Sequence, residues 1–256
     1  MAGAFYNLEH WSDTDMIEIR NLSKTFGTVQ AVKDVTLTIS KGEIFGILGE
    51  NGAGKTTTLR MMATMLKPTE GTVIVNGIDI REKPDQARSC MGILFGGESG
   101  LYDRLSVAEN IRYFAELNGM DRASAQKRID YLVEVFDMKE YINRRAGKLS
   151  KGMRQKAAFS RSIVHDPEIL LLDEPGAGLD VSAMNEMQIF IKMQKELGKT
   201  IILSSHTMDE VEKLCDRIGI IHNGVLVEQG TLKEIKTKYG SEKIEEIFIR
   251  LVGERQ

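Results

Sequence analysis

Short apolar runs alternate with helical repeats along most of this chain. Glycine or polar residues bound each run, which is typical of buried strands. The runs are residues 43–48, 91–95, 169–172 and 200–204. Because helical patterns separate them, the order of elements predicts an α/β fold.

Helical periodicity is clearest after the first two of these runs. One helix is predicted after residues 49–56, with Pro68 marking its end. Another begins at Ser106, which forms the sequence of a capping box with Glu109. A further helical pattern follows it with no strand between them. These helices predict an all-helical lobe, over about residues 97–160, inserted into the α/β core.

Two dipeptides predict antiparallel hairpins. Asn76-Gly77 and Asn223-Gly224 each separate a pair of short strand patterns, and such dipeptides are strong two-residue hairpin signals. The predicted strands outside the four apolar runs are residues 16–20, 35–39, 72–75, 78–80, 217–222 and 225–228. Added to the α/β core, they predict a mixed sheet and an antiparallel β subdomain.

Length and charge narrow the class of protein. The chain has 256 residues, enough for one large α/β domain or one domain with an inserted lobe. Its formal net charge of −3 argues against a surface that coats nucleic acid, so no nucleic-acid partner is expected. No apolar run reaches the roughly eighteen residues that predict a membrane-spanning helix.

The N-terminus and the cysteines add two smaller expectations. Residues 1–15 are polar and lack the pattern of a secretory signal, so we interpret them as an N-terminal extension and place the fold in residues 16–256. Cys90 and Cys215 lie beside apolar residues and are expected to be buried free thiols. A disulfide or a metal-binding pair is the alternative.

Residues 49–56 form the segment with the clearest chemistry. They read Gly-Glu-Asn-Gly-Ala-Gly-Lys-Thr and fit the phosphate-loop pattern G-x-x-x-x-G-K-[ST]. The glycines let backbone N–H groups turn toward phosphate oxygens, and the following helix N-terminus adds partial positive charge. Lys55 is expected at the β- and γ-phosphates and the Thr56 hydroxyl at Mg²⁺. The alternative is a glycine-rich turn that binds nothing, but the flanking strand and helix favour a nucleoside triphosphate site.

Two adjacent carboxylates end the apolar run at residues 169–172. Asp173 and Glu174 would be costly to bury without a cation nearby, and strand geometry predicts that they point to opposite faces. One can then hold Mg²⁺ while the other polarises a water molecule. A solvated strand end is the alternative. His206 follows another strand at the same predicted edge, although a lone histidine there is more often structural.

Two further residues have both a functional and a structural interpretation. Ser150 is a natural N-cap that leaves a helix N-terminus facing outward, where an anion can bind. Phe26 is expected in a loop upstream of the phosphate loop, where its ring can stack on a base. An ordinary core phenylalanine is the equal alternative for Phe26.

From residue 16 onward, these motifs together resemble the ATP-binding cassette of ABC transporters, and they occur in that family's order. The resemblance identifies residues 49–56 as the Walker A loop, 169–174 as the Walker B strand and 149–155 as the signature motif. It also identifies residues 178–180 as the D-loop, Phe26 as the adenine-stacking aromatic and His206 as the switch histidine.

The resemblance implies a role for each matching residue. Asp173 is expected to hold Mg²⁺, Glu174 to be the general base, and His206 to contact the γ-phosphate. Ser150 and Gly152 are expected to reach the γ-phosphate bound by a second cassette. The expected catalytic residues are Lys55, Glu174 and His206, and the expected metal ligands are Thr56 and Asp173. The expected ATP-binding residues are Phe26, Gly49, Asn51, Gly52, Ala53, Gly54, Lys55, Thr56, Thr57, Ser150, Gly152 and Asp180.

The chain departs from the family pattern in three places. In the signature motif, Lys151 replaces a glycine and Met153 a glutamine. Gly96 stands where a glutamine is usual, and Glu98 is a candidate substitute. Residues 175–180 lack the customary hydroxyl residues but retain Asp180.

The resemblance implies an ATPase subunit at the cytoplasmic face of the membrane. It is expected to bind ATP and Mg²⁺, to form a homodimer of cassettes, and to drive a separate multi-spanning permease. The sequences of residues 95–98, 150–155 and 244–248 resemble those of the ATPase subunits of ABC-2-type exporters. Sodium-extruding subunits are the most similar, and drug exporters are the alternative. The alternatives are a cassette ATPase acting on ribosomes or DNA, and a GTP-dependent switch, although the guanine motif N-K-x-D does not occur.

Overall fold

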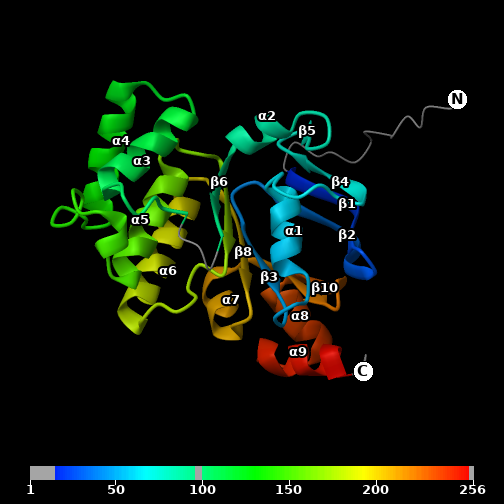
Figure 1. Ribbon diagram of the computed structural model, residues 1–256. Helices are drawn as coiled ribbons and strands as arrows, with labels where there is room; N and C mark the ends of the chain where they lie inside the picture. Colours follow the sequence, from blue (N-terminus) through cyan, green and yellow to red (C-terminus); the bar gives the residue numbers. More distant parts are fainter. Residues whose placement is uncertain (1–14, 96–99, 254–256) are drawn as a thin grey trace, which may run out of the picture.

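Two β-sheets organise the part of the chain that the computed structural model describes, residues 15–95 and 100–253. Figure 1 shows the antiparallel sheet on the side of the N-terminus and the larger sheet in the middle of the molecule. The antiparallel sheet has the order β2-β1-β4-β5, with β1 (Asp15–Phe26), β2 (Val29–Ser40), β4 (Glu70–Val75) and β5 (Ile78–Asp79). The larger sheet has the order β10-β9-β3-β8-β7-β6, with β3 (Ile44–Leu48), β6 (Met91–Leu94), β7 (Ile169–Asp173), β8 (Thr200–Ser205), β9 (Arg217–His222) and β10 (Val225–Thr231).

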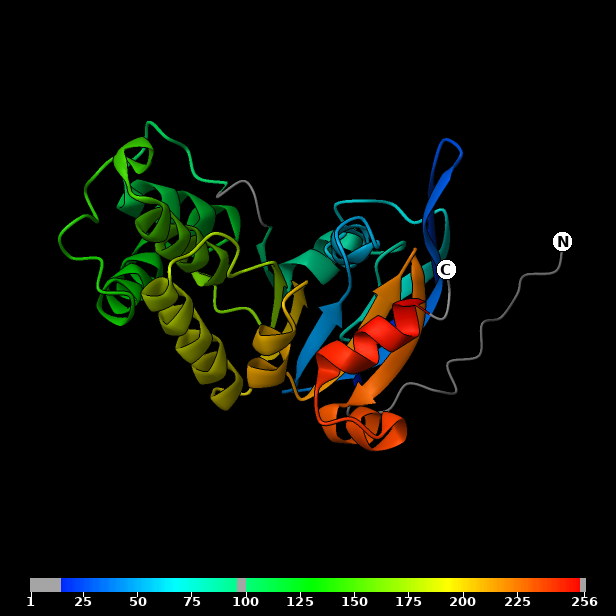
Figure 2. The same cartoon turned by 90° about the horizontal axis from the view of Figure 1, so that it is seen from below.

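Helices cover the larger sheet from two sides. The helix α1 (Lys55–Met62) packs between the two sheets, while a group of helices lies on the opposite side of the molecule from the antiparallel sheet (Figures 1 and 2). We call α3 (Val107–Leu117), α4 (Arg122–Val135), α5 (Lys151–Ile163) and α6 (Val181–Glu196) the helical group. The other helices are α2 (Pro84–Ser89), α7 (Met208–Leu214), α8 (Leu232–Tyr239) and α9 (Ile244–Gly253), with a 3-10 turn at Ala146–Lys148.

Side chains along the central strands point alternately to the two faces of the sheet, and this divides the core in two. In β3, Phe45 and Ile47 join a cluster with α1 and the antiparallel sheet, whereas Ile44 and Leu48 join a cluster with the helices of the other face. Side chains of successive strand residues point to opposite faces, so a strand covered on both sides must be apolar throughout. This explains why the sequence shows continuous apolar runs at these strands.

The register of the parallel strands sets where the loops emerge. Leu48 of β3 pairs with Ser205 of β8, and Asp173 of β7 pairs with Ser204 of β8. Three neighbouring strands therefore end level with one another. The segments that follow them begin at one edge of the sheet, which is the usual ligand-binding edge of α/β proteins.

The predicted α/β architecture, with a mixed sheet, an antiparallel β subdomain and an inserted helical lobe, is confirmed. The pattern of parallel β3, β6, β7, β8 and β9 becomes mixed only through β10, which pairs with β9 in an antiparallel manner. The hairpin at Asn76-Gly77 was expected to contribute to this mixed sheet, but its strands β4 and β5 belong to the separate antiparallel sheet. Both residues of that turn have positive φ, as a two-residue hairpin requires.

Two local predictions were wrong in detail. The helix α1 ends at Met62, well before Pro68, because Thr64 takes a φ of 58° and the chain turns back so that Met65 N–H donates to the Arg60 carbonyl. Cys215 is a buried free thiol as expected, but Cys90 is only half-buried because it lies at the exposed end of α2. The candidate positions Gly96 and Glu98 lie outside the described residues, as do residues 1–14.

No helix in the described part of the chain combines the length and apolar character that a bilayer crossing needs.

Candidate functional site

The phosphate loop, residues 49–56, connects β3 to α1 and is braced by distant segments. Gly224 N–H donates to the Ala53 carbonyl at 2.9 Å, and Lys33 N–H donates to the Gly224 carbonyl at 2.8 Å. At Gly54, φ is 110°, and an added Cβ would lie 2.6 Å from the Ala31 carbonyl oxygen. Only glycine fits this position without a backbone shift. The β9–β10 turn and β2 therefore hold the loop in a fixed shape.

The N-terminus of α1 opens toward this loop without a competing anion. Gly54 provides no side-chain cap, and the first turn of α1 contains no acidic residue. Helix N-termini carry unsatisfied N–H groups and partial positive charge, and both favour a bound phosphate.

Lys55 lies across the mouth of the loop. Its side chain is only 5% exposed, and Nζ donates to the carbonyl oxygens of Gly49 at 2.8 Å and Glu50 at 3.0 Å. The ammonium is also 3.6 Å from Oε1 of Glu174. A buried cation held by carbonyls and one carboxylate can exchange these partners for phosphate oxygens. This part of the site fits an anionic ligand.

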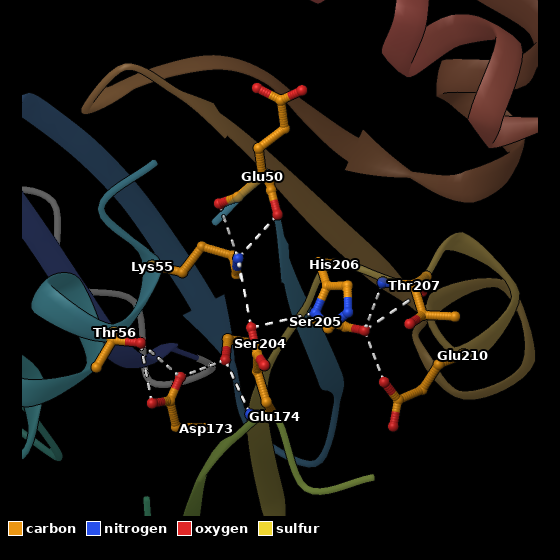
Figure 3. A network of polar contacts seen from close by, with 11 residues as sticks. Glu50, Lys55, Thr56, Asp173, Glu174, Ser204, Ser205, His206, Thr207 and Glu210 are labelled. Carbon is orange, nitrogen blue, oxygen red and sulfur yellow. Dashed lines mark hydrogen bonds and ion pairs between the residues drawn. The ribbon is translucent and has the colours of Figure 1, made fainter. Parts of the chain in front are cut away.

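Asp173 faces the first turn of α1 from the end of β7. The Thr56 hydroxyl lies 2.9 Å from Oδ2, and the Ser204 hydroxyl donates to Oδ1 at 2.5 Å (Figure 3). Asp173 is only 5% exposed, so its charge is costly without a cation. Among the described residues no group of three acidic, histidine or cysteine side chains could hold a metal alone. The arrangement therefore fits a cation such as Mg²⁺, which binds a few protein oxygens together with phosphate oxygens.

Glu174 leaves the strand, which corrects the prediction that the two carboxylates point to opposite faces. β7 ends at Asp173, and Glu174 has a φ of 47°, in the left-handed region. Its N–H donates to the Ser204 hydroxyl at 3.0 Å, and this contact holds the turn. A left-handed conformation costs a non-glycine residue about 1–2 kcal/mol. Both carboxylates consequently face the phosphate loop, Asp173 at Thr56 and Glu174 at Lys55.

His206 completes this edge. It follows β8, its side chain is 49% exposed, and Nδ1 lies 3.2 Å from Oε1 of Glu174. One carboxylate oxygen of Glu174 thus lies between the ammonium of Lys55 and the imidazole of His206 (Figure 3).

The residues that support this edge belong to none of the motifs found in the sequence. Ser204 joins Asp173 to the backbone of Glu174, and Ser205 hydrogen-bonds Glu210 behind His206. Their signal in the sequence was the pair of serines directly before the histidine, polar residues at the end of a buried strand.

Phe26 is exposed, but it does not lie in a loop as expected. It is the last residue of β1, which continues beyond the predicted strand because β1 pairs with β2 up to the hairpin. The residue is 48% exposed, and its ring centroid lies 5.1 Å from Nζ of Lys24. This exposure excludes the alternative of a core phenylalanine and leaves a ring surface available for stacking.

The remaining candidate residues belong to the helical group. The Ser150 hydroxyl accepts from Met153 N–H at 3.3 Å and caps α5, and the Asp180 carboxylate accepts from Ala183 N–H at 2.9 Å and caps α6. A Cβ added to Gly152 would meet only Ala183, at 3.9 Å, so nothing in the described chain requires glycine there. Figure 1 shows α5 and α6 in the helical group, apart from α1. The fold gathers the phosphate loop, Asp173, Glu174 and His206, whereas Ser150, Gly152 and Asp180 lie at the N-termini of α5 and α6, where the two caps bond their own helices.

Comparison with known proteins agrees with the motifs. A family model described as ABC transporter matches residues 32–177. The chain is 47% identical over 238 residues to the ABC transporter ATP-binding protein NatA of Bacillus subtilis, a match that covers 91% of this chain and 97% of the relative.

Two solved structures are similar over most of their length. One, described as an ATP-binding subunit of an ABC transporter, has a TM-score of 0.85 and 28% identity, and the match covers 92% of this chain and 99% of the other. The second, a dimeric ATP-binding cassette in a post-hydrolysis state with bound ADP and Pi, has a TM-score of 0.77 and 26% identity, with 84% and 98% covered.

Proposed function

The chain belongs to the ABC transporter family of ATP-binding cassettes, and from this premise we propose that it drives export through a separate membrane permease. It is an ATP-binding subunit and an ATPase of the ABC type. Subunits of this kind dimerise and pair with membrane components of a transporter.

The placement of Glu174 carries the proposal for the catalytic residues. Its Oε1 is 3.6 Å from the ammonium of Lys55 and 3.2 Å from Nδ1 of His206. In the proposed reaction Lys55 exchanges its carbonyl partners for the terminal phosphates, and the carboxylate then orients the attacking water. His206 contacts the γ-phosphate. Catalysis in such a site consists mainly of positioning and of charge stabilisation in a sheltered environment.

Asp173 and Thr56 are the proposed ligands of Mg²⁺. When bound, the ion neutralises negative charge on the phosphates. The Ser204 hydroxyl keeps Asp173 in place by donating to the oxygen beside the one nearest Thr56. The nucleotide itself is proposed to contact residues 49–57, with Phe26 stacking on the base.

A second copy of the chain is proposed to complete each site. Ser150 caps α5, Gly152 lies in its first turn and Asp180 caps α6, whereas the phosphate loop leads into α1, which Figure 1 shows apart from α5 and α6. The absence of any steric reason for glycine at position 152 supports an approach by another molecule. The similarity to a dimeric cassette bound to ADP and Pi supports the same arrangement. We therefore propose a homodimer that closes on ATP.

The proposal also covers organisation and location. Residues 16–256 form the cassette, about residues 97–160 form its helical lobe, and residues 1–15 are an extension. The dimer is peripheral at the cytoplasmic face of the membrane, bound to its permease. The proposed cargo is sodium or a drug-like molecule. The sequences of residues 150–155 and 244–248, which resemble those of ABC-2-type exporter subunits, support this proposal.

Replacement of the proposed base tests the mechanism. Glu174→Gln should keep ATP binding, remove most hydrolysis and accumulate the closed dimer, because the amide cannot accept the proton of water. Nucleotide binding, phosphate release and sedimentation of the purified variant measure the three outcomes. Glu134→Gln, which alters a surface carboxylate paired with Lys139, is the matched control and should behave as wild type. Wild-type turnover by Glu174→Gln would exclude Glu174 from the mechanism.

A separate experiment tests the cargo. The chain is purified in detergent with the membrane protein that accompanies it, and both are placed in vesicles loaded with sodium or with a drug. If neither cargo moves when ATP is added, the proposed substrates are excluded, and the assignment as an ATPase is unaffected.

A further inference from the structure

A buried carboxylate holds the turn that carries His206 from behind. Glu210 of α7 is 7% exposed, and its Oε2 accepts a hydrogen bond from the Ser205 hydroxyl at 2.6 Å. The same hydroxyl accepts from Thr207 N–H at 3.0 Å. Because Ser205 and Thr207 flank His206, this chain of contacts fixes the backbone on both sides of the imidazole (Figure 3).

The other oxygen of Glu210 rests against the segment that follows β7. A Cβ added to Gly176 would lie 3.1 Å from Oε1 of Glu210, so the carboxylate lies against the backbone of Gly176. Gly176 comes two residues after Glu174. Glu210 therefore touches both segments whose side chains, Glu174 and His206, meet at 3.2 Å.

We propose that Glu210, through Ser205, is a positioning residue for hydrolysis, which keeps the imidazole of His206 beside the carboxylate of Glu174. The inference rests on the proposed role of His206, and Glu210 acts on the reaction only through that histidine. Burial raises the pKa of Glu210, against the effect of the Ser205 hydrogen bond. A carboxylate in this place has a desolvation cost that an apolar side chain of similar size would avoid.

Three substitutions remove the contact to different degrees. Glu210→Leu removes the acceptor, Ser205→Ala removes the donor, and Glu210→Gln keeps one acceptor oxygen. We expect kcat to fall about tenfold in the first two and less in the third, with KM for ATP changed less than about twofold. The smaller loss in Glu210→Gln is the rescue that a positioning role requires.

Glu212→Gln is the matched control. Glu212 lies on the same helix, two residues further on, where it pairs with Lys236 at 3.0 Å and accepts from Ile244 N–H at 3.1 Å. It has no contact with the turn of His206 among those that the described residues make. Its replacement should lower stability without lowering kcat.

The decisive measurement uses a His206→Ala background. If Glu210 acts through the histidine, Glu210→Leu should lower kcat no further there, because residues that act as a unit are not additive. A full second loss would overturn the proposal, and so would a wild-type kcat in Glu210→Leu alone. If Glu210→Leu does not fold, Ser205→Ala and Glu210→Gln provide the same comparison.

Magnetic resonance of the His206 imidazole distinguishes a change in the position of the ring from a general loss of stability. The imidazole resonances of His206 should shift in Glu210→Leu and Ser205→Ala and stay in place in Glu212→Gln. Unmoved resonances in all three would overturn the proposal. Wild-type kcat in His206→Ala would remove the histidine from the proposed function, and with it the positioning role. A loss in His206→Ala with no loss in Glu210→Leu would remove the positioning role alone.

Discussion

The C-terminal edge of the parallel strands and the helical group differ in how much of the proposed site one chain completes. At the strand edge, Lys55, Asp173, Glu174 and His206 are connected by contacts of 2.5 to 3.6 Å, partly through Ser204. In the helical group, Ser150 only caps its own helix. The first region is assembled by folding. The second presents groups that we propose act on the nucleotide of a second chain.

The helix N-termini show the same difference in charge. The helices α3 and α8 begin with capping boxes in which Glu109 and Glu234 supply the acid. The helices α1 and α5 have no acidic residue in their first turns. Glutamate at this position stabilises a helix, so its absence leaves the positive end free for another anion. The helices α4 and α6 also lack an acidic residue in the first turn, but the carboxylates of Asp121 and Asp180 cap them. Among the described α-helices, α1 and α5 are therefore the two with no acidic residue at the N-cap or in the first turn, and they are those assigned to phosphate in the proposed dimer.

Removal of the buried carboxylate at the strand edge should have the largest effect. In Asp173→Asn, a neutral amide cannot balance a divalent cation, so we expect Mg²⁺-dependent hydrolysis to fall about 10²–10³-fold. Phosphate release as a function of Mg²⁺ concentration measures this. Asp166→Asn is the control, because its exposed carboxylate pairs with Arg128 and Lys199 away from the site. Equal rates in the two variants would contradict the role of Asp173.

A cap substitution in the helical group should have a smaller effect that depends on function. Ser150→Ala and Ser106→Ala both remove an N-cap hydroxyl, and each should lower the free energy of unfolding by about 1 kcal/mol. Only Ser150→Ala should also lower kcat, by about tenfold, if Ser150 serves the partner's nucleotide. Denaturant unfolding and phosphate release measure the two effects. An equal kcat in both variants would reduce Ser150 to a structural cap.

Mixing two inactive variants sharpens this test. Lys55→Ala damages the strand edge and Gly152→Arg damages the helical group, so a mixed dimer retains one composite site with both halves intact. Activity should therefore return on mixing, in proportion to the mixed dimers formed. Two variants that stay inactive when mixed would show that both regions serve the same chain.

The smallest expected effect concerns pH. Burial raises the pKa of Glu210 above its ordinary 4.5, so the folded state holds this proton more tightly than the unfolded state. Its contribution to stability is complete below the ordinary pKa and is lost as pH rises through the raised value. Glu210→Gln should remove that decline, as measured by urea unfolding at a series of pH values. His206, Glu174 and Cys215 are the charged or titratable groups that share this environment. If the free energy of unfolding of Glu210→Gln depends on pH as it does in the wild type, the raised pKa does not belong to Glu210.

Local signals predicted the elements and most of the strand edge. The phosphate loop is defined by a strand, a glycine pattern and a helix that are contiguous in sequence, and the caps at Ser106 and Ser150 depend on three or four residues. The hairpin at Asn76 needs only a two-residue turn. Such features can be read from a single chain because the residues that determine them are neighbours.

Features that depend on tertiary contacts could not be predicted. The left-handed turn at Glu174 exists because Ser204, thirty residues later, accepts its N–H. The support of His206 by Glu210 crosses from a strand end to a helix, and neither residue resembles a motif. The early end of α1 lies at the left-handed turn of Thr64, whose hydroxyl accepts from Nε of Arg88, twenty-four residues later, and no proline marks this position in the sequence.

The bracing of the phosphate loop has a kinetic consequence. Because β2 and the turn at Gly224 set its conformation during folding, the loss of entropy needed to order the loop is not repeated at each encounter with a nucleotide. In the proposed dimer, loading and release can then follow one another quickly, and the approach and separation of the two subunits become the slow step of the cycle.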